Sequence, residues 1–216
     1  MLQKTTYHHG ELRTAILHFA MKLLREKGVK GVSIRAVANM ADVSQTAIYH
    51  HYKNKNILLC ALASEGFKMM SQRQEAIFAQ EESPSHSLKK LGMDYVSFSL
   101  ENPHLFILMF GATLPFSEWA DELRENVVKT FMPLNSVAHK RIEKYDLPFS
   151  GDAMALSSWT LVHGLSSLII NGRLGPLGGR VLGKKPHDPM QHDDYLALAG
   201  MVTDIFAGIY NSKDDD

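Results

Sequence analysis

The sequence has a single cysteine, Cys60, in 216 residues. One cysteine excludes a disulfide within the chain and a thiolate metal cluster, so secretion is not indicated and a reducing compartment is expected. Long hydrophobic runs are also missing, because the longest, Leu105 to Phe116, is too short to cross a bilayer. The first residues lack the apolar core of a signal peptide. We therefore expect a soluble cytoplasmic protein that does not enter a membrane.

Strand signals are scarce as well. Apolar and polar residues do not alternate over any long stretch, whereas apolar residues recur at helical spacing along most of the chain. Prolines at or near the breaks, such as Pro103, Pro115 and Pro148, separate the segments. The pattern predicts an all-α protein with helices at about 12–28, 34–40, 44–51, 55–80, 85–101, 103–114, 117–145, 151–171 and 192–211.

Residues 171–191 interrupt this pattern. They contain five glycines and three prolines, too many helix breakers for a stable helix. The composition predicts a long loop, and loops of this length within a compact domain are usually functional or mobile.

The net charge of the chain is zero, but the charge is unevenly distributed. Residues 1–55 carry nine Lys and Arg against three acidic residues, a net charge of +6, and the remaining residues carry −6. A basic head on an acidic body indicates that the head contacts a polyanion. A chance asymmetry of an ordinary solvated surface would give the same charges. The residue pattern within the head must therefore distinguish contact with a polyanion from chance.

Two short predicted helices in the head, separated by a three-residue break, fit a helix-turn-helix. Ser33 and Ser44 stand where N-caps are expected. Residues that would pack the two helices together are Ile34, Val37, Ala38, Val43 and Ile48. The polar and aromatic residues Gln45, Thr46, Tyr49 and His50 would point outward from the second helix, which enters the major groove in this motif. Lys53, Lys55 and the free backbone N–H groups of the following long helix would then contact phosphate.

The run from Val43 to Leu58, V-S-Q-T-A-I-Y-H-H-Y-K-N-K-N-I-L, resembles the signature of the tetracycline-repressor-like (TetR) family, approximately V-S-x-x-T-[LI]-Y-x-[HY]-F-x-x-K-x-x-L. The likeness covers about residues 8–65. It departs from the family at Asp42, where the turn usually has glycine, and at Ala47, which replaces a threonine. A weaker likeness is Trp159 to Gly164, similar to a W-x-x-x-H-G element of one C-terminal subtype.

The resemblance implies an all-helical homodimeric transcription factor. A three-helix head (1–55) would be joined by a long helix to a regulatory and dimerisation bundle (56–212), with an acidic tail (213–216). It would bind double-stranded DNA at a near-palindromic operator. The expected DNA contacts are Ser33, Arg35, Ser44, Gln45, Thr46, Ala47, Tyr49, His50, His51, Lys53 and Lys55. The dimer would form through helices at about 151–171 and 192–211, where small and apolar residues such as Ala155, Leu161, Ala199 and Ile205 recur.

Bulky apolar residues in the body suggest a second site. Met-rich and aromatic surfaces adapt to varied apolar ligands, although each such residue taken alone fits an ordinary core equally well. The predicted lining of a ligand site is Met93, Phe106, Met109, Phe110, Trp119, Trp159 and His163, with His163 as the polar group. The alternative for Trp159 and His163 is packed core, with the histidine bonded to backbone.

Signals for catalysis are weak. The run from Gly178 to Lys185 nearly spells a phosphate-binding loop, but Lys185 occupies the position of the hydroxyl residue and no strand precedes it. His187, His192, Asp193 and Asp194 lack the spacing of a zinc site. We expect neither an enzyme nor a cofactor or metal. Two hypotheses stand: a repressor released from its operator by an apolar or aromatic small molecule, or a DNA-binding structural or cell-division adaptor without such a ligand.

Overall fold

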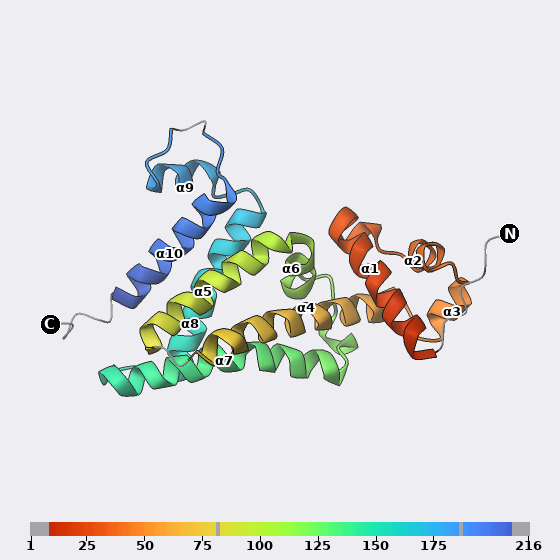
Figure 1. Ribbon diagram of the computed structural model, residues 1–216, viewed down its shortest axis with the longest axis horizontal. Coiled ribbons are helices and arrows are strands. Elements are labelled where there is room, and N and C mark those ends of the chain that lie inside the picture. The colour runs from red at the N-terminus through yellow and green to blue at the C-terminus, as the bar shows by residue number, and fades with distance from the viewer. Residues whose placement is uncertain (1–8, 81–82, 186–187, 209–216) are drawn as a thin grey trace. The chain divides into compact units, whose positions relative to one another are not determined.

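The computed structural model describes residues 9–80, 83–185 and 188–208. Ten α-helices and one short 3-10 helix occupy most of them, and the described residues contain no strand (Figure 1). The all-α prediction is confirmed. The helices form two compact units: unit 1 comprises residues 1–69 and 102–127, and unit 2 comprises residues 70–101 and 128–216.

Unit 1 begins with α1 (His9–Gly31), α2 (Ile34–Ala41) and α3 (Gln45–Tyr49). It also contains the first part of α4 (Lys55–Phe78), α6 (Pro103–Phe110), the 3-10 helix η1 (Phe116–Glu118) and the start of α7 (Asp121–Tyr145). Two predicted boundaries were wrong here. The helix expected at 103–114 ends at Phe110, and the one expected from residue 117 is a 3-10 turn followed by α7. The 3-10 turn follows Pro115, which has no N–H to donate.

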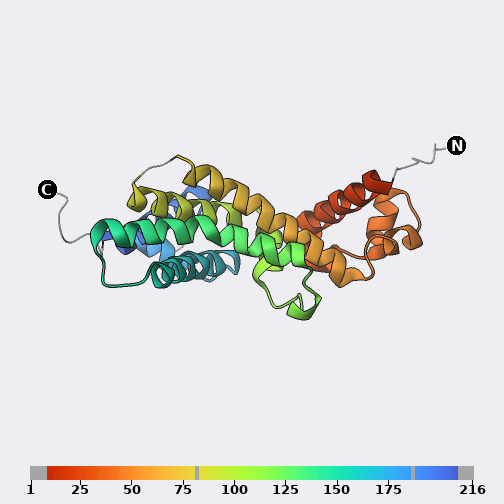
Figure 2. The same ribbon diagram turned by 90° about the horizontal axis from the view of Figure 1, so that it is seen from below.

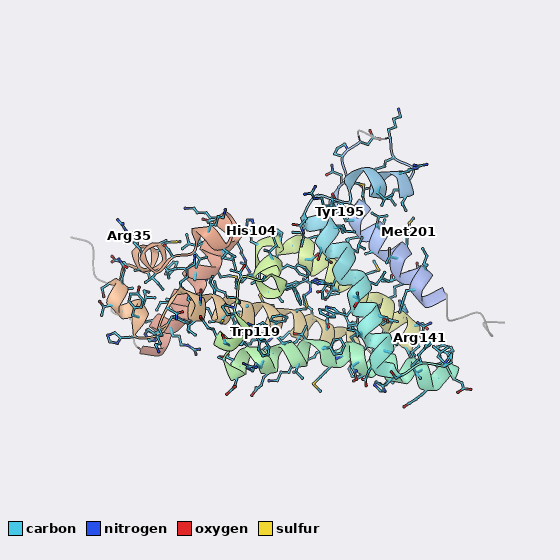
Figure 3. All side chains as sticks on the ribbon, turned by 180° about the vertical axis from the view of Figure 1, so that it is seen from behind. Arg35, His104, Trp119, Arg141, Tyr195 and Met201 are labelled. Atoms are coloured by element: carbon cyan, nitrogen blue, oxygen red, sulfur yellow. The ribbon has the colours of Figure 1, made fainter. Side chains whose placement is uncertain are left out.

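The core of unit 1 follows the predicted apolar faces. Ile16 and Leu23 of α1 are buried, together with Ile34 and Val37 of α2. The sequence predicts that this helix ends at Gly28, whereas α1 has a kink there and continues to Gly31. Gly28 has φ 65° and ψ −172°, outside the helical region. Next to this glycine, His104 of α6 lies at the C-terminal end of α1, with Nδ1 3.1 Å from the Arg25 carbonyl oxygen (Figure 3).

Helix α6 packs closely on α4 within unit 1. The aromatic rings of Phe67 and Phe110 meet edge to face, with centroids 5.2 Å apart. Downstream of α6, the amide of Asn56 donates to the Glu118 carboxylate at 3.1 Å, and that of Asn126 donates to the Ser64 hydroxyl at 2.9 Å. These bonds hold η1 and the first turns of α7 against α4. Figure 2 shows the ribbons of α4 and α7 next to each other.

Unit 2 contains the remaining parts of α4 and α7 with α5 (Pro84–Glu101), α8 (Gly151–Ile170), α9 (Gly175–Val181) and α10 (His192–Gly208). Helix α5 packs against both α8 and α10. Gly92 permits this, since a β-carbon there would stand 2.8 Å from Thr203 and 3.3 Å from Val162. Lys89 of α5 and Asp204 of α10 form an ion pair at 2.7 Å.

The prediction of an uninterrupted loop at 171–191 was wrong, because α9 forms inside it. A proline within the first helical turn does not break a helix, since its missing N–H has no helical partner there. Leu174 and Gly178 are buried, and a β-carbon at Gly178 would approach Leu198 of α10 to 2.9 Å. Packing against α10 therefore outweighs the low helix propensity of this segment. An ion pair between Lys184 and Asp194 ties the following residues to α10.

Helix α8 is the one described helix that is long and apolar enough to cross a membrane by length and composition. The core helix of a soluble protein passes the same criterion. Several of its apolar side chains, including Leu156, Leu161 and Leu168, are exposed in the single chain.

Candidate nucleic-acid interface

The helix-turn-helix formed by α2 and α3 contains two serine caps, one at the start of each helix, and one left-handed residue in the turn. Ser33 Oγ accepts a hydrogen bond from the Ala36 N–H at 3.1 Å, and Ser44 Oγ accepts one from the Ala47 N–H at 3.1 Å. Each cap of this kind stabilises a helix by about 1 kcal/mol. Between them, Asp42 has φ 52° and ψ 46°, the left-handed conformation that the turn requires. Aspartate therefore adopts here the geometry for which the family usually uses glycine.

The inner faces of these helices match the prediction, which leaves the polar face of α3 in solvent. Val37 and Ile48 have 0% of their surface exposed and hold the helices together. The exposed residues among the predicted DNA contacts are Arg35, Ser44, Gln45, Thr46, Tyr49, His50 and Lys53. The half-buried ones are Ser33, Ala47, His51 and Lys55. None of the predicted contacts is buried. Arg35 lies on α2 (Figure 3).

Tyr49 is the most unusual of these side chains. Its ring is 51% exposed, although a large aromatic residue usually gains by burial. The neighbouring Tyr52 is 2% exposed and belongs to the core. The structure thus separates two tyrosines of one short segment, one for packing and one facing outward.

The start of α4 differs from the predicted phosphate seat in its details. Lys55 Nζ donates to the Val29 carbonyl oxygen at 3.3 Å, so this ammonium group ties α4 to the end of α1. Asn54, which sequence reasoning missed, accepts a hydrogen bond from the Ile57 N–H at 2.9 Å and caps α4. Its position three residues before Ile57 at a helix start was the available signal. Lys53, the other lysine expected to contact phosphate, is exposed.

The predicted ligand-site residues fall into both units. Phe106, Met109, Phe110 and Trp119 belong to unit 1, whereas Met93, Trp159 and His163 belong to unit 2. In unit 1 the rings of Phe106 and Phe110 lie 4.8 Å apart. Trp119 lies 5.0 Å from Phe116, on which the Arg124 guanidinium stacks at 4.4 Å.

In unit 2 Trp159 and His163 meet a residue that sequence reasoning missed, Tyr95 of α5. The Tyr95 hydroxyl lies 2.8 Å from His163 Nδ1 and accepts a hydrogen bond from Trp159 Nε1 at 3.2 Å. One arrangement satisfies all three groups: the indole donates to the hydroxyl, and the hydroxyl donates to an unprotonated Nδ1. His163 is therefore bonded to a side chain, where the packed-core alternative had a backbone group. The helical spacing of Tyr95 gave no hint of its partner on α8.

Burial keeps this cluster uncharged at neutral pH. Removal from water lowers the pKa of the His163 imidazole and raises the pKa of the Tyr95 hydroxyl above its ordinary value. Phe131 of α7 covers Trp159, with centroids 6.4 Å apart.

Two family models match the chain. The model of bacterial regulatory proteins of the tetR family matches residues 16–62, which include α2, α3 and their turn. The model of the tetracyclin repressor-like C-terminal domain matches residues 88–181. The chain belongs to the TetR family. Both departures from its usual pattern, Asp42 and Ala47, leave the helix-turn-helix geometry intact.

Individual proteins resemble the chain in sequence or in fold. The tetracycline repressor protein class A from transposon 1721 of Escherichia coli is 35% identical over 91 residues, 42% of this chain. The match spans 36% of that repressor's own length. A solved structure from Rhodococcus sp. RHA1, of unknown function, has a TM-score of 0.76 at 26% identity and covers 95% of this chain and 98% of that one. FadR of Bacillus subtilis, solved in complex with stearoyl-CoA, shares the fold with a TM-score of 0.67 at 15% identity, covering 90% of this chain and 97% of that chain.

Proposed function

We propose that the protein is a DNA-binding transcriptional repressor of the cytoplasm that acts as a homodimer and releases its operator when a small molecule binds. The observation that supports this most directly is α3. Its inner residue is fully buried, its start is capped by Ser44, and its outer face exposes Gln45, Thr46, Tyr49 and His50. A rigid short helix with polar groups on one side suits the major groove.

The outer face of α3 offers the chemistry that base edges require. The Gln45 amide can pair with adenine N6 and N7, and the Thr46 methyl group can contact a thymine methyl. Lys53 and Arg35 are exposed on either side of α3 in sequence and would bind phosphate oxygens. Phosphate contacts set affinity and register, whereas the α3 side chains select the sequence.

A dimer is proposed because one head contacts too few base pairs to be specific in a genome. The exposed apolar surface of unit 2 supports it: Met201 is 45% and Ile205 63% exposed on α10. An apolar groove of about 520 Å³ lies between α8, α9 and α10. Patches of this kind on a soluble protein mark interaction sites. Ala155 and Ala199, expected at the interface, are buried within the chain and serve its own core.

The dimer has a direct test with a matched control. Ile205→Lys places a charge in the proposed interface and should give a monomeric mass by light scattering at micromolar concentration. Val128→Lys on α7 is the control, because Val128 is exposed to a similar degree, 61%, outside the proposed interface. A dimeric Ile205→Lys protein, or a monomeric wild type, would contradict this interface.

The proposed effector is largely apolar. Each unit by itself has bulky side chains suited to such a ligand, Phe106 and Met109 in unit 1 and Trp159 in unit 2. The Bacillus subtilis FadR structure, which shares the fold, was solved in complex with stearoyl-CoA. Helix α4 begins at Lys55 in unit 1 and continues into unit 2, so one continuous helix connects the DNA-binding head to unit 2. A coupling of about 1–3 kcal/mol would change operator occupancy severalfold or more.

The experiment for this proposal is selection of bound duplexes from a random pool, followed by titration of hydrophobic compounds against the selected operator. A near-palindromic consensus and release by at least one compound class are the expected results. Operator binding that no compound changes would favour the adaptor hypothesis. Failure to enrich any sequence would contradict the regulator proposal itself.

A further inference from the structure

Helix α9 exposes two large apolar side chains at the groove between α8, α9 and α10. Leu177 is 64% and Val181 57% exposed, and both line the groove. They are four residues apart and therefore lie on one side of the helix. Leu174 and Gly178 are buried, so α9 is packed against unit 2 by other residues than these two. Leu177 and Val181 remain available to a partner.

The groove is part of a larger apolar face of unit 2. Of the thirteen large apolar side chains that are exposed among the described residues, seven belong to α8, α9 and α10. Besides the two on α9, apolar residues that line the groove or share a side of a helix with its lining are Leu161, Leu165 and Leu168 on α8 and Leu198, Met201 and Ile205 on α10. Residues spaced three and four apart in this way form the ridges through which helices pack together. The apolar face is therefore suited to helices of a partner.

A small molecule fits this groove poorly. Pockets for small ligands bury roughly 70–90% of the ligand surface. Here the walls are themselves open, since Leu177, Val181 and Ile205 are each more than half exposed. A small molecule in the groove would remain largely in water, whereas the side of a second protein can cover the walls completely.

The charges beside the groove fit a second copy of this chain. Arg180 precedes Val181 on α9, and Asp204 lines the groove on α10, where it pairs with Lys89. Across a two-fold axis a patch meets its own copy, so charges of a single sign would repel each other, and this patch carries both signs. The groove is also continuous with the surface proposed above for the dimer, because Met201 and Ile205 line it.

We infer that α9 is part of the homodimer interface, and that Leu177 and Val181 of each subunit pack against the apolar face of the other. The inference rests on the proposed homodimer and adds α9 to it. Residues 175–181, expected from composition to be part of a loop, then form a docking element that covers the groove in both subunits.

The first test is the dissociation constant of the full-length dimer, measured by sedimentation equilibrium. Leu177→Glu should raise it at least about 100-fold, because the substitution removes a buried leucine and occurs twice in a symmetric interface. Val128→Glu on α7 is the matched control. Val128 is exposed to a similar degree outside the apolar face, so its dissociation constant should stay within about threefold of the wild type. Circular dichroism should show the same helix content for all three proteins.

A second measurement leaves the interface nearly intact. The only native cysteine, Cys60, is buried, so a new thiol can be labelled selectively with N-ethylmaleimide. The labelling rate of Leu177→Cys should fall at least about tenfold as the protein concentration is raised through the dissociation constant, since dimerisation removes the thiol from solvent. The rate of Val128→Cys should not change with concentration.

The possible results separate this inference from the proposed function. A dimer that Ile205→Lys dissociates but Leu177→Glu does not would overturn the role of α9 and leave the proposed dimer standing. Labelling of Leu177→Cys at one rate over all concentrations would do the same. A monomeric wild type would overturn both. If that monomer bound 1-decanol and Leu177→Glu abolished the binding, the groove would belong to an apolar small molecule instead.

Discussion

Gly66 of α4 lies so close to Met109 of α6 that a β-carbon on the glycine would stand 2.5 Å from the methionine Sδ atom. Leu105 would be 3.0 Å from the same point. Side chains of α6 therefore pack directly on the backbone of α4 at Gly66, within unit 1. A shift of α6 must therefore displace α4 or break this contact. Helix α4 begins immediately after the segment that carries Lys53, so a displacement of α4 would reach that segment.

Substituting Gly66 with alanine should destabilise the protein. The added methyl group forces Met109 and Leu105 aside, and overpacking of this kind costs about 1–3 kcal/mol. Urea unfolding followed by circular dichroism measures it. Gly164→Ala is the control, since a β-carbon on this helical glycine meets nothing within 4 Å. That control should gain about 0.5–1 kcal/mol from helix propensity. Equal stability of the two variants would show that the α4–α6 contact is loose.

Asp42→Gly should stabilise the head. Asp42 holds a left-handed conformation at φ 52°, which glycine adopts without steric cost. The greater freedom of glycine in the unfolded chain offsets part of this gain, so we expect about 0.5–1 kcal/mol. Asp42→Ala should destabilise, because alanine tolerates this conformation less well. Thermal unfolding of the wild type and the two variants tests this. A lower unfolding midpoint for Asp42→Gly than for the wild type would contradict a steric cost of the left-handed conformation at Asp42.

The two lysines at the start of α4 should behave differently. Lys53→Ala should weaken binding about equally on all DNA sequences and reduce the slope of log K against log salt by about one, as for one lost phosphate contact. Lys55→Ala should instead lower the stability of unit 1, because Lys55 bonds to the Val29 carbonyl at 3.3 Å. Fluorescence anisotropy across a salt series and unfolding of both variants test this. The assignment fails if Lys55→Ala alone changes the salt slope.

The stability of the protein should depend on pH through His163 and Tyr95. Burial lowers the pKa of His163 below its ordinary value of 6.5, so the unfolded chain binds the proton more readily, and this stability is lost as pH falls below about 6.5. Burial raises the pKa of Tyr95 above its ordinary value of 10.0, so the corresponding stability is lost as pH rises through and above that value. His163→Gln should flatten the acid limb of a plot of stability against pH. An acid limb of unchanged steepness would mean that other groups dominate it.

The head was predicted in detail because its signals are local. The caps at Ser33 and Ser44 and the inner face of α2 each depend on residues within one or two helical turns. The same locality explains why every predicted DNA contact proved exposed or half-buried.

The body was predicted less well because its features depend on residues far apart in the chain. Helix α9 forms because Leu174 and Gly178 pack within unit 2, Gly178 against Leu198 of α10, a contact that local composition does not reveal. Tyr95 and His163 are bonded across 68 positions, and neither has a sequence signal for the other.

The central claim is that the exposed face of α3 selects the DNA sequence. It is tested most directly by measuring the affinity of the Gln45→Ala/Tyr49→Ala double variant for the selected operator and for a scrambled duplex of the same length. We predict that the wild type prefers the operator strongly, that the variant loses most of this preference, at about 1–3 kcal/mol for each base contact removed, and that its affinity for the scrambled duplex stays unchanged. Retention of the full preference by the double variant would contradict the claim.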